Sequence, residues 1–421
     1  MHIRSWQAVL VIAAISCAVV VAQVAPGTRF TLATLSLSSG VTAFSLMGTA
    51  ALLGSRWQFI ESLFGGLDRV YLTHKWLGVW ALGFASFHLA FKAGIGTWDT
   101  ASIITLPPFY TRLVRQLSFV ALMLIVLLAL NRKIPYHRWR LWHKSSGPLF
   151  LIVILHWLSF ESPITLGSAA GTWLATISVL GVAGAGYKLA LYPFVSKHAE
   201  YRVVGVSPGE DALHLEMAPV MNPVRFEAGQ FAFIRMKEDG LREPHPFTIA
   251  SGSESHGHVN FVIRSLGDYT RKLTRDTRVG MHADVYAPYG RFKRPSDANQ
   301  EVWIGGGVGI SPFISWLTDE SGTGFDKVTL FYFFTPGREF PNSEVLADLA
   351  RRRGAGYVPV AAGAMSPEFT KPFHDIVKNV GAGSVSISFC GPAGLLQAIR
   401  ATMREHDIPE ANLQYEYFEF R

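Results

Sequence analysis

Four histidines lie inside long apolar stretches of this 421-residue chain, and they form two matched pairs. His74 and His88 stand 14 residues apart on one stretch, and His143 and His156 stand 13 residues apart on another. At about 1.5 Å of rise per residue, a helix would separate the members of each pair by about 20 Å. His74 and His143 would then share one depth, and His88 and His156 the other. Two facing imidazoles at each depth predict the axial ligands of a b-type haem, and hydrogen bonding within a helical bundle is the alternative.

One feature of the second stretch opposes this arrangement. Thirteen residues at 100° each turn His156 about 220° away from His143, so an ideal helix would not present both on one face. Gly147 and Pro148 lie between the two histidines. We expect them to bend or unwind the helix there.

A second set of residues suits a ligand that has a planar ring and a pyrophosphate. Thr248 offers a hydroxyl group and backbone groups to a ring, while Arg264 and the turn at Gly267–Thr270 offer a guanidinium group and backbone N–H groups to phosphates. His245–Thr248 could also be an ordinary strand. The residues of these two segments are His245, Pro246, Phe247 and Thr248, and then Arg264, Ser265, Gly267 and Thr270.

Two glycine-containing turns suit a further nucleotide. The first follows a predicted strand and opens a predicted helix, so its backbone can approach a phosphate whose charge the helix N-terminus favours. The second also ends a strand and begins a helix, although Cys390 could serve only in core packing. The residues of the two turns are Gly305, Gly306, Gly307, Gly309, Ser311 and Pro312, and then Cys390, Gly391 and Pro392.

Composition divides the chain into a membrane half and a soluble half. Charged residues make up only 16% of the whole, and the mean hydropathy is +0.24. Residues 1–192 hold 14 Lys and Arg but only 4 Asp and Glu, whereas the remainder holds 24 and 27. The basic excess therefore belongs to the membrane half, which makes nucleic acid a poor explanation for it. Two cysteines exclude a disulfide scaffold and a four-cysteine metal site within this chain.

Six apolar stretches precede residue 192 and predict a six-helix transmembrane bundle. Basic residues concentrate in the segment 131–144, which the positive-inside rule places in the cytoplasm together with both termini. The first stretch could instead be a signal peptide that is cleaved near residue 25. The six stretches are 5–24, 32–54, 71–91, 117–130, 143–160 and 170–191.

The soluble half predicts two folds in succession. Short strands at 201–206, 213–217, 230–236 and 258–265 indicate a small antiparallel β-barrel. Buried strands at 302–304, 328–334 and 385–389 alternate with helices, which indicates an α/β doubly wound domain. We therefore expect a multi-domain membrane protein with parts at 1–192, 196–296 and 297–421.

These motifs, in this order, and the ending Tyr415–Phe418 resemble the ferric reductase and NADPH oxidase superfamily, and most closely its compact bacterial members. The resemblance implies a ferredoxin-NADP reductase-like soluble half with FAD on the barrel residues and a nicotinamide nucleotide on the two glycine-containing turns. It implies reacting-site roles for Thr248 and Cys390, and for Phe418 stacked on the flavin. It also places Arg338 where a 2′-phosphate would be read, which favours NADPH. Some oxygen-reducing members have a histidine where this chain has Lys92.

The resemblance implies transmembrane electron transfer from cytoplasmic NAD(P)H, through FAD and two b-type haems, to an outer acceptor. Oxygen giving superoxide is the favoured acceptor. The alternatives are a ferric or cupric metalloreductase, an electron-donor subunit for a quinone or an exported partner protein, and a haem-free flavin reductase anchored by helices. We expect an integral protein of a bacterial cytoplasmic membrane that contacts lipid and no nucleic acid.

Overall fold

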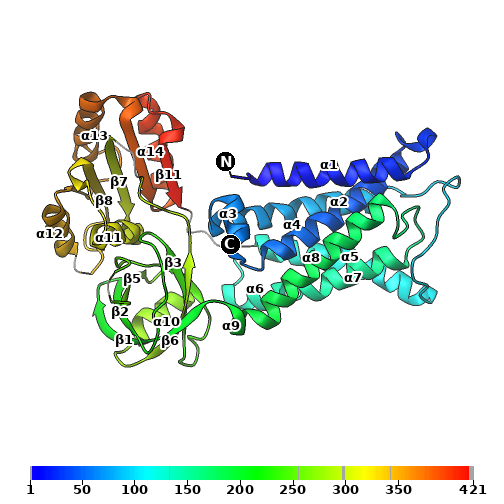
Figure 1. Cartoon of the computed structure of the whole chain (residues 1–421), viewed down its shortest axis with the longest axis horizontal. Helices are drawn as coiled ribbons and strands as arrows, with labels where there is room; N and C mark the ends of the chain where they lie inside the picture. Colours follow the sequence, from blue (N-terminus) through cyan, green and yellow to red (C-terminus); the bar gives the residue numbers. More distant parts are fainter. Residues whose placement is uncertain (1, 132, 255, 296–298, 342, 417–421) are drawn as a thin grey trace. The chain divides into compact units, whose positions relative to one another are not determined.

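The computed structural model describes residues 2–131, 133–254, 256–295, 299–341 and 343–416, and these form two compact units (Figure 1). The first unit runs to Ser196, and the second begins at Lys197. The predicted aromatic Phe418 lies outside the described residues.

Helices form at all six predicted apolar stretches. The fourth extends further toward its N-terminus than its apolar core suggested, because Pro108 starts the helix nine residues earlier. The helices of the first unit are α1 (Ser5–Gln23), α2 (Leu32–Leu53), α3 (Gln58–Phe64), α4 (Leu67–Ala90), α5 (Pro108–Leu130), α6 (Tyr136–His143), α7 (Ser146–Ser159), α8 (Ala169–Gly186) and α9 (Tyr192–Val195).

Four helical segments among the described residues are long and apolar enough to cross a membrane. They are Ser5–Gln23, Leu32–Leu53, Pro108–Leu130 and Ala169–Val195. By contrast, α7 has only 14 residues, and α4 carries Asp68, Arg69 and Lys75 besides its two histidines. The count of six membrane-crossing helices therefore stays a prediction.

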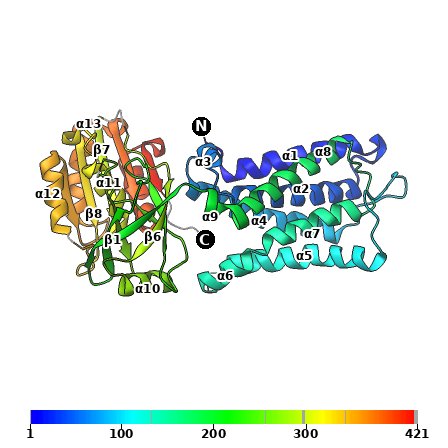
Figure 2. The ribbon, with the colours of Figure 1, turned by 60° about the horizontal axis from the view of Figure 1, so that its bottom comes forward.

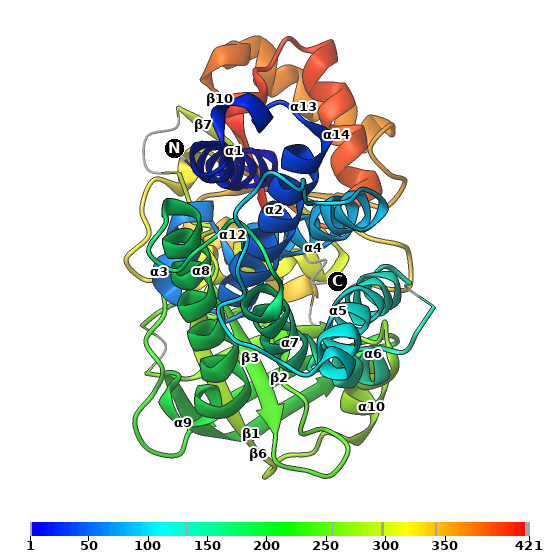
Figure 3. The same cartoon turned by 90° about the vertical axis from the view of Figure 1, so that its right-hand side faces the viewer.

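Helix α2 lies between α1, α4 and α8, as the views from two sides and along the helices show (Figures 2 and 3). Glycines permit close contact between α2 and α8. A β-carbon placed on Gly181 would lie 3.0 Å from the Cα of Gly48, and one placed on Gly184 would lie 2.7 Å from the Cα of Leu52. Such close backbone approach is a common way of packing helices in membranes.

The helix of the fifth apolar stretch begins only after His143, which is the last residue of a separate helix. Helix α6 ends at His143, and α7 begins at Ser146 after a turn at Lys144 and Ser145. Pro148, the third residue of α7, has no N–H with which to bond the carbonyl of Lys144. The predicted interruption is confirmed, and it lies just before Gly147 and Pro148.

The second unit begins with a six-stranded antiparallel sheet in the order β4-β3-β6-β1-β2-β5. An isolated bridge between Ile249 and Phe261 brings the two ends of the sheet together, so the barrel is nearly closed. The four predicted strands are present, His245–Thr248 forms the strand that the sequence analysis gave as an alternative, and β6 is a strand that it missed. The elements are β1 (His198–Pro208), β2 (Ala212–Pro219), β3 (Phe231–Met236), β4 (His245–Thr248), β5 (Val259–Arg264), α10 (Asp268–Asp276) and β6 (His282–Tyr289).

A five-stranded parallel sheet follows, in the order β11-β10-β7-β8-β9. The three predicted strands form its centre, and the sequence analysis missed its two edge strands, β9 and β11. The elements are β7 (Gln300–Gly306), α11 (Ser311–Thr318), β8 (Val328–Phe333), α12 (Ser343–Arg353), β9 (Gly356–Val360), α13 (Pro367–Val380), β10 (Val385–Cys390), α14 (Ala393–Glu405) and β11 (Leu413–Glu416).

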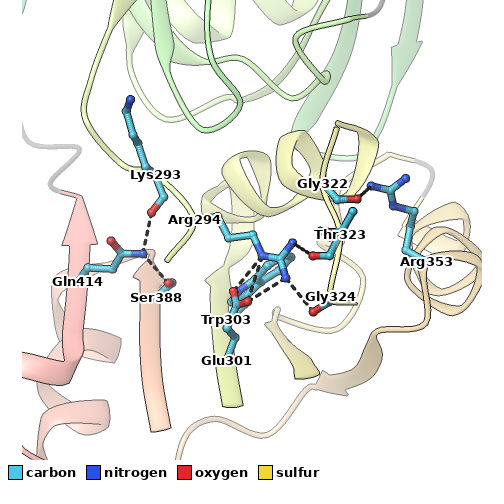
Figure 4. A network of polar contacts seen from close by, with 10 residues as sticks. All are labelled: Lys293, Arg294, Glu301, Trp303, Gly322, Thr323, Gly324, Arg353, Ser388 and Gln414. Carbon is cyan, nitrogen blue, oxygen red and sulfur yellow. Dashed lines mark hydrogen bonds and ion pairs between the residues drawn. The ribbon is translucent and has the colours of Figure 1, made fainter. Parts of the chain in front are cut away.

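A polar network fixes the segment that joins the barrel to the parallel sheet (Figure 4). Arg294 makes a bidentate pair with the buried carboxylate of Glu301, which also accepts a hydrogen bond from the indole N–H of Trp303. Gln414 donates from β11 to the carbonyl oxygen of Lys293. The joining segment is thus held at both the centre and the edge of the sheet, so barrel and sheet form one unit.

Candidate functional site

Both histidines of α4 are oriented by backbone carbonyl groups of α2. The Nδ1 of His74 is 2.8 Å from the carbonyl oxygen of Ala50, and the Nδ1 of His88 is 2.9 Å from that of Ser36. A carbonyl oxygen can only accept, so each Nδ1 carries the proton and donates it. Each Nε2 is then an unprotonated nitrogen, which is the form that binds a metal.

A glycine on α2 makes room for the His88 ring, and a second glycine, directly after α2, lies at the same spacing in ordinary van der Waals contact with the His74 ring. Gly40 and Gly54 each come four residues after an accepting carbonyl, and they are 14 residues apart, like the two histidines. A β-carbon placed on Gly40 would lie 2.8 Å from the Nδ1 of His88, and one placed on Gly54 would lie 3.9 Å from the Cε1 of His74. Only glycine therefore fits position 40. The sequence analysis missed both glycines, although their matching spacing was visible.

The second pair of histidines faces the first. The ring centres of His74 and His143 are 5.7 Å apart. His156 lies close enough to His88 and to Arg115 for their positive charges to repel one another. The Nδ1 atoms of His143 and His156 are buried and have no hydrogen-bond partner among the described residues. The structure therefore brings the four predicted ligands together as two pairs.

The spacing of His74 and His143 is that of two imidazoles on opposite sides of one metal ion. Two imidazoles that bind one metal from opposite sides hold their ring centres roughly 6 Å apart, because each metal–nitrogen bond is about 2 Å long. The separation of His74 and His143 is close to that value. Within the described ranges, no group of three or more His, Cys, Asp and Glu could hold a bare metal ion. Two histidines alone suit a metal whose other ligands come from a macrocycle.

The barrel residues predicted to contact a planar ring gather around β4. The hydroxyl group of Thr248 is buried and has no partner among the described residues, so it is free to bond a ligand. The ring of His245 stacks on Tyr269, with ring centres 3.6 Å apart, and its Nδ1 is 3.0 Å from the carbonyl oxygen of Glu243. Pro246 and Phe247 lie between His245 and Thr248 on β4. Tyr269, which the sequence analysis did not assign to the site, therefore fixes the plane of the His245 ring.

The predicted pyrophosphate contacts lie at the end of β5 and the start of α10. The Nε and Nη2 atoms of Arg264 both lie 3.1 Å from one carboxylate oxygen of Asp211. The backbone N–H of Ser265 bonds the carbonyl of the same aspartate. The hydroxyl oxygen of Thr270 accepts from the N–H of Gly267 at 2.9 Å. The remaining first-turn amides of α10 have no partner within the helix and can meet a phosphate.

The two glycine-containing turns meet at the carboxyl ends of β7 and β10. Gly305 pairs with Cys390 across the sheet. A β-carbon placed on Gly309 would lie 2.2 Å from the carbonyl oxygen of Cys390, and one placed on Gly391 would lie 3.2 Å from the Cα of Gly306. Glycine is thus required for the two turns to touch. Nucleotides bind at this edge of parallel sheets.

The start of α11 completes the first turn. Gly307 has a φ of +55°, and a β-carbon placed on it would lie 3.5 Å from the Nη1 of Arg264. The two predicted nucleotide sites are therefore neighbours. Ser311 is buried and donates its hydroxyl group to the carbonyl of Val308, with Pro312 buried beside it. These two residues hold the turn in shape.

Cys390 is fully buried at the end of β10. Burial, and then the charge of Glu416, raise the pKa of its thiol well above the ordinary value. At neutral pH the group is therefore a thiol and not a thiolate nucleophile. Its place at the carboxyl edge of the sheet, beside Gly391 and Pro392, is compatible with contact to a nucleotide ring.

Two families match this chain. Residues 39–154 match the ferric reductase like transmembrane component, and residues 196–301 match an FAD-binding domain. The first match contains all four histidines, and the second contains the barrel residues described above.

Known proteins are similar to parts of this chain. A propane 2-monooxygenase reductase component of Rhodococcus jostii is 26% identical and covers 52% of this chain. A probable cell surface ferric reductase of Aspergillus oryzae, kap2, is 25% identical and covers 67%. The matches span only 62% and 40% of those proteins' own lengths. The flavohemoglobin structure from Malassezia yamatoensis, with bound FAD and heme, has a TM-score of 0.50 at 16% identity and covers 94% of this chain and 98% of its own.

Proposed function

Because the chain belongs to the ferric reductase and NADPH oxidase superfamily, whose members are integral membrane oxidoreductases with an FAD-binding domain, we propose that it carries electrons across a membrane. The donor is a cytoplasmic nicotinamide nucleotide, the cofactors are FAD and two b-type haems, and the acceptor lies on the outer face. The observation that supports this most is the repeated pattern of α2 and α4. Two histidines, two accepting carbonyls and two glycines recur there with one spacing.

When bound, the flavin accepts a hydride and releases single electrons, and haem iron takes and gives single electrons. The chain's residues determine where this happens. The hydroxyl group of Thr248 and the stacked ring of His245 orient the flavin, while Arg264 and the start of α10 hold its pyrophosphate. Gly305–Gly309 and Cys390–Pro392 hold the nicotinamide nucleotide at the sheet edge. By the resemblance, Phe418, which lies outside the described residues, would cover the flavin ring until the nicotinamide enters.

In the first unit, His74 and His143 would hold the inner haem, and His88 and His156 would hold the outer one. The carbonyls of α2 keep the Nδ1 protons of His74 and His88 in place, which fixes the orientation of these two rings and raises the basicity of their Nε2 atoms. Two positions about 20 Å apart along a helix divide a ~30 Å hydrocarbon layer into short steps for an electron. We propose three parts, 1–192, 196–296 and 297–421, in a bacterial cytoplasmic membrane with both termini in the cytoplasm.

We favour oxygen as the acceptor. With two histidines at each haem, iron has no open position, so an acceptor must react at the haem edge. One nucleotide gives two electrons, and two molecules of oxygen take one each to form two superoxide ions, with one proton released. The resemblance of the chain to a probable cell surface ferric reductase supports a second candidate, a chelated ferric or cupric ion. An electron-donor subunit for a quinone or a partner protein is a third.

A stepwise spectrum tests the acceptor. The purified, FAD-supplied protein in detergent receives nucleotide without oxygen and then receives air, while superoxide is measured. We expect the nucleotide to reduce the haem bands and air to reoxidise them within the mixing time. The amount of superoxide should be proportional to the amount of haem that is reoxidised. Slow reoxidation by air but fast reoxidation by ferric citrate would identify a metalloreductase, and slow reoxidation by both would indicate a partner acceptor. An absence of haem bands would leave an anchored flavin reductase.

A further inference from the structure

The loop after β8 carries Arg338, the residue expected to read a 2′-phosphate. In doubly wound folds, the end of the second strand meets the adenosine ribose. An acidic residue there binds a free 2′-hydroxyl group, whereas an arginine accommodates a 2′-phosphate. The Nε of Arg338 lies 4.0 Å from the Oδ2 of Asp211, on the turn between β1 and β2. The only described ion pair of this guanidinium group is with the barrel.

Asp211 forms ion pairs with two arginines, Arg264 and Arg338. The same Oδ2 atom accepts from Nε and Nη2 of Arg264, each at 3.1 Å. The other oxygen, Oδ1, is buried and has no hydrogen-bond partner among the described residues. One carboxylate therefore lies between the arginine of the flavin site and the arginine of the nucleotide site.

Two further carboxylates lie at the same loop. The backbone N–H of Gly337 donates to the Oε1 of Glu339 at 3.3 Å. The Oε2 of Glu210 is 3.6 Å from the position of a β-carbon placed on Gly337. Arg338 is thus accompanied by Glu210, Asp211 and Glu339.

The neighbouring tyrosines add no charge. Burial raises the pKa of Tyr332 and of Tyr357 to about 12, so both are neutral at physiological pH. Once Arg264 is bound to a flavin pyrophosphate, three carboxylates remain beside one guanidinium group. The local charge is then negative.

We infer that the electron donor is NADH and that Asp211 determines this choice. The inference rests on the proposed function and opposes the preference for NADPH that Arg338 alone suggests. A 2′-phosphate would bring two negative charges toward these carboxylates, which is the kind of repulsive element that sets specificity. A ribose 2′-hydroxyl group can instead donate a hydrogen bond to one of them.

Anaerobic stopped-flow reduction of the flavin in the full-length, FAD-loaded protein tests this directly, because it needs no haem and no acceptor. We expect the second-order rate constant with NADH to exceed that with NADPH by at least roughly tenfold. Equal rates, or a faster reaction with NADPH, would overturn the inference and leave the proposed function standing. If neither nucleotide bleached the flavin, both the inference and the proposed function would be overturned.

Three variants and one control locate the cause. Asp211→Asn and Glu339→Gln should each raise the rate with NADPH relative to NADH by about two- to fivefold, the range for a partly exposed charge. The control is Glu238→Gln, at an exposed carboxylate two residues after the end of β3, and it should leave the ratio unchanged. Arg338→Ala should change the ratio by less than about twofold, because its charge is already paired. A selective loss of NADPH activity of tenfold or more in Arg338→Ala would contradict the inference.

Discussion

At the scale of single residues, the chemistry of the first unit depends on which nitrogen of each imidazole is free. The carbonyls of Ser36 and Ala50 decide this for His88 and His74, because they can only accept the Nδ1 proton. No comparable partner is described for His143 and His156. The α4 histidines are therefore the more firmly oriented member of each pair.

Replacement of His88 tests its role as a ligand. His88→Leu should remove one haem and lower nucleotide-driven reduction of an outside acceptor by at least roughly a hundredfold, since loss of a group that merely hydrogen-bonds to a metal ligand already costs about 10–100-fold. Flavin reduction by nucleotide should be retained. The control is His374→Leu, an exposed histidine of α13, which should change neither rate. Unchanged acceptor reduction in His88→Leu would exclude this route for the electrons.

Gly40 offers a sharper test, because it touches the ring without being a ligand. In Gly40→Ala the new methyl group would lie 2.8 Å from the Nδ1 of His88, so the ring must turn away from the carbonyl of Ser36. We expect loss or a lowered midpoint potential of one haem only, measured by redox titration. Gly83→Ala on α4 has nothing within 4 Å of the new methyl group and is the matched control. Equal spectra for both variants would contradict the role given to Gly40.

The sequence could predict the four ligands because a histidine in an apolar helix is costly and so marks a function. It could not predict the accepting carbonyls, because every residue has one. Which carbonyl faces a histidine depends on how α2 and α4 align, and that alignment comes from packing. Asp211 was missed for a similar reason, since only the fold brings the β1–β2 turn to Arg264 and Arg338.

At the scale of elements, the interruption between α6 and α7 places His143 independently of His156. A continuous helix would turn these residues about 220° apart. The turn at Lys144 and Ser145 removes that constraint, and His143 comes to lie beside His74. The sequence predicted that the helix would bend or unwind at Gly147 and Pro148, but it placed both histidines in one apolar stretch at 143–160.

Pro148→Ala should weaken the interruption. The new N–H can bond the carbonyl of Lys144 and so favours a continuous helix. We expect the haem content to fall toward one per chain, with the pair His88 and His156 retained. Pro108→Ala, at the first residue of α5, removes a proline where no such bond is lost and should keep two haems. Two haems in Pro148→Ala would show that the turn does not depend on this proline.

At the scale of the whole molecule, the division into two units follows the distribution of charge. Residues 1–192 hold few carboxylates, whereas the rest has an ordinary soluble balance. That contrast predicted the two parts from sequence. The edge strands β9 and β11 escaped prediction, because β9 is only partly buried and β11 has four residues.

The second unit should act alone as a flavin reductase. A fragment that begins at Lys197 should remain soluble without detergent, bind FAD and let NADH bleach the flavin at about the rate of the full chain, because its core and its nucleotide turns are complete. It should contain no haem. A fragment that folds, judged by circular dichroism, but does not bind FAD would mean that the flavin site needs the first unit.

The central claim is that two histidine pairs hold two haems, and the most direct measurement is the number of haems per flavin. We would determine it by pyridine haemochrome and flavin absorbance for the purified chain and for His74→Leu and His88→Leu. The account predicts two haems for the unaltered protein and one for each variant, with different midpoint potentials for the haem that remains. One haem in all three proteins, or none in the unaltered one, would contradict it.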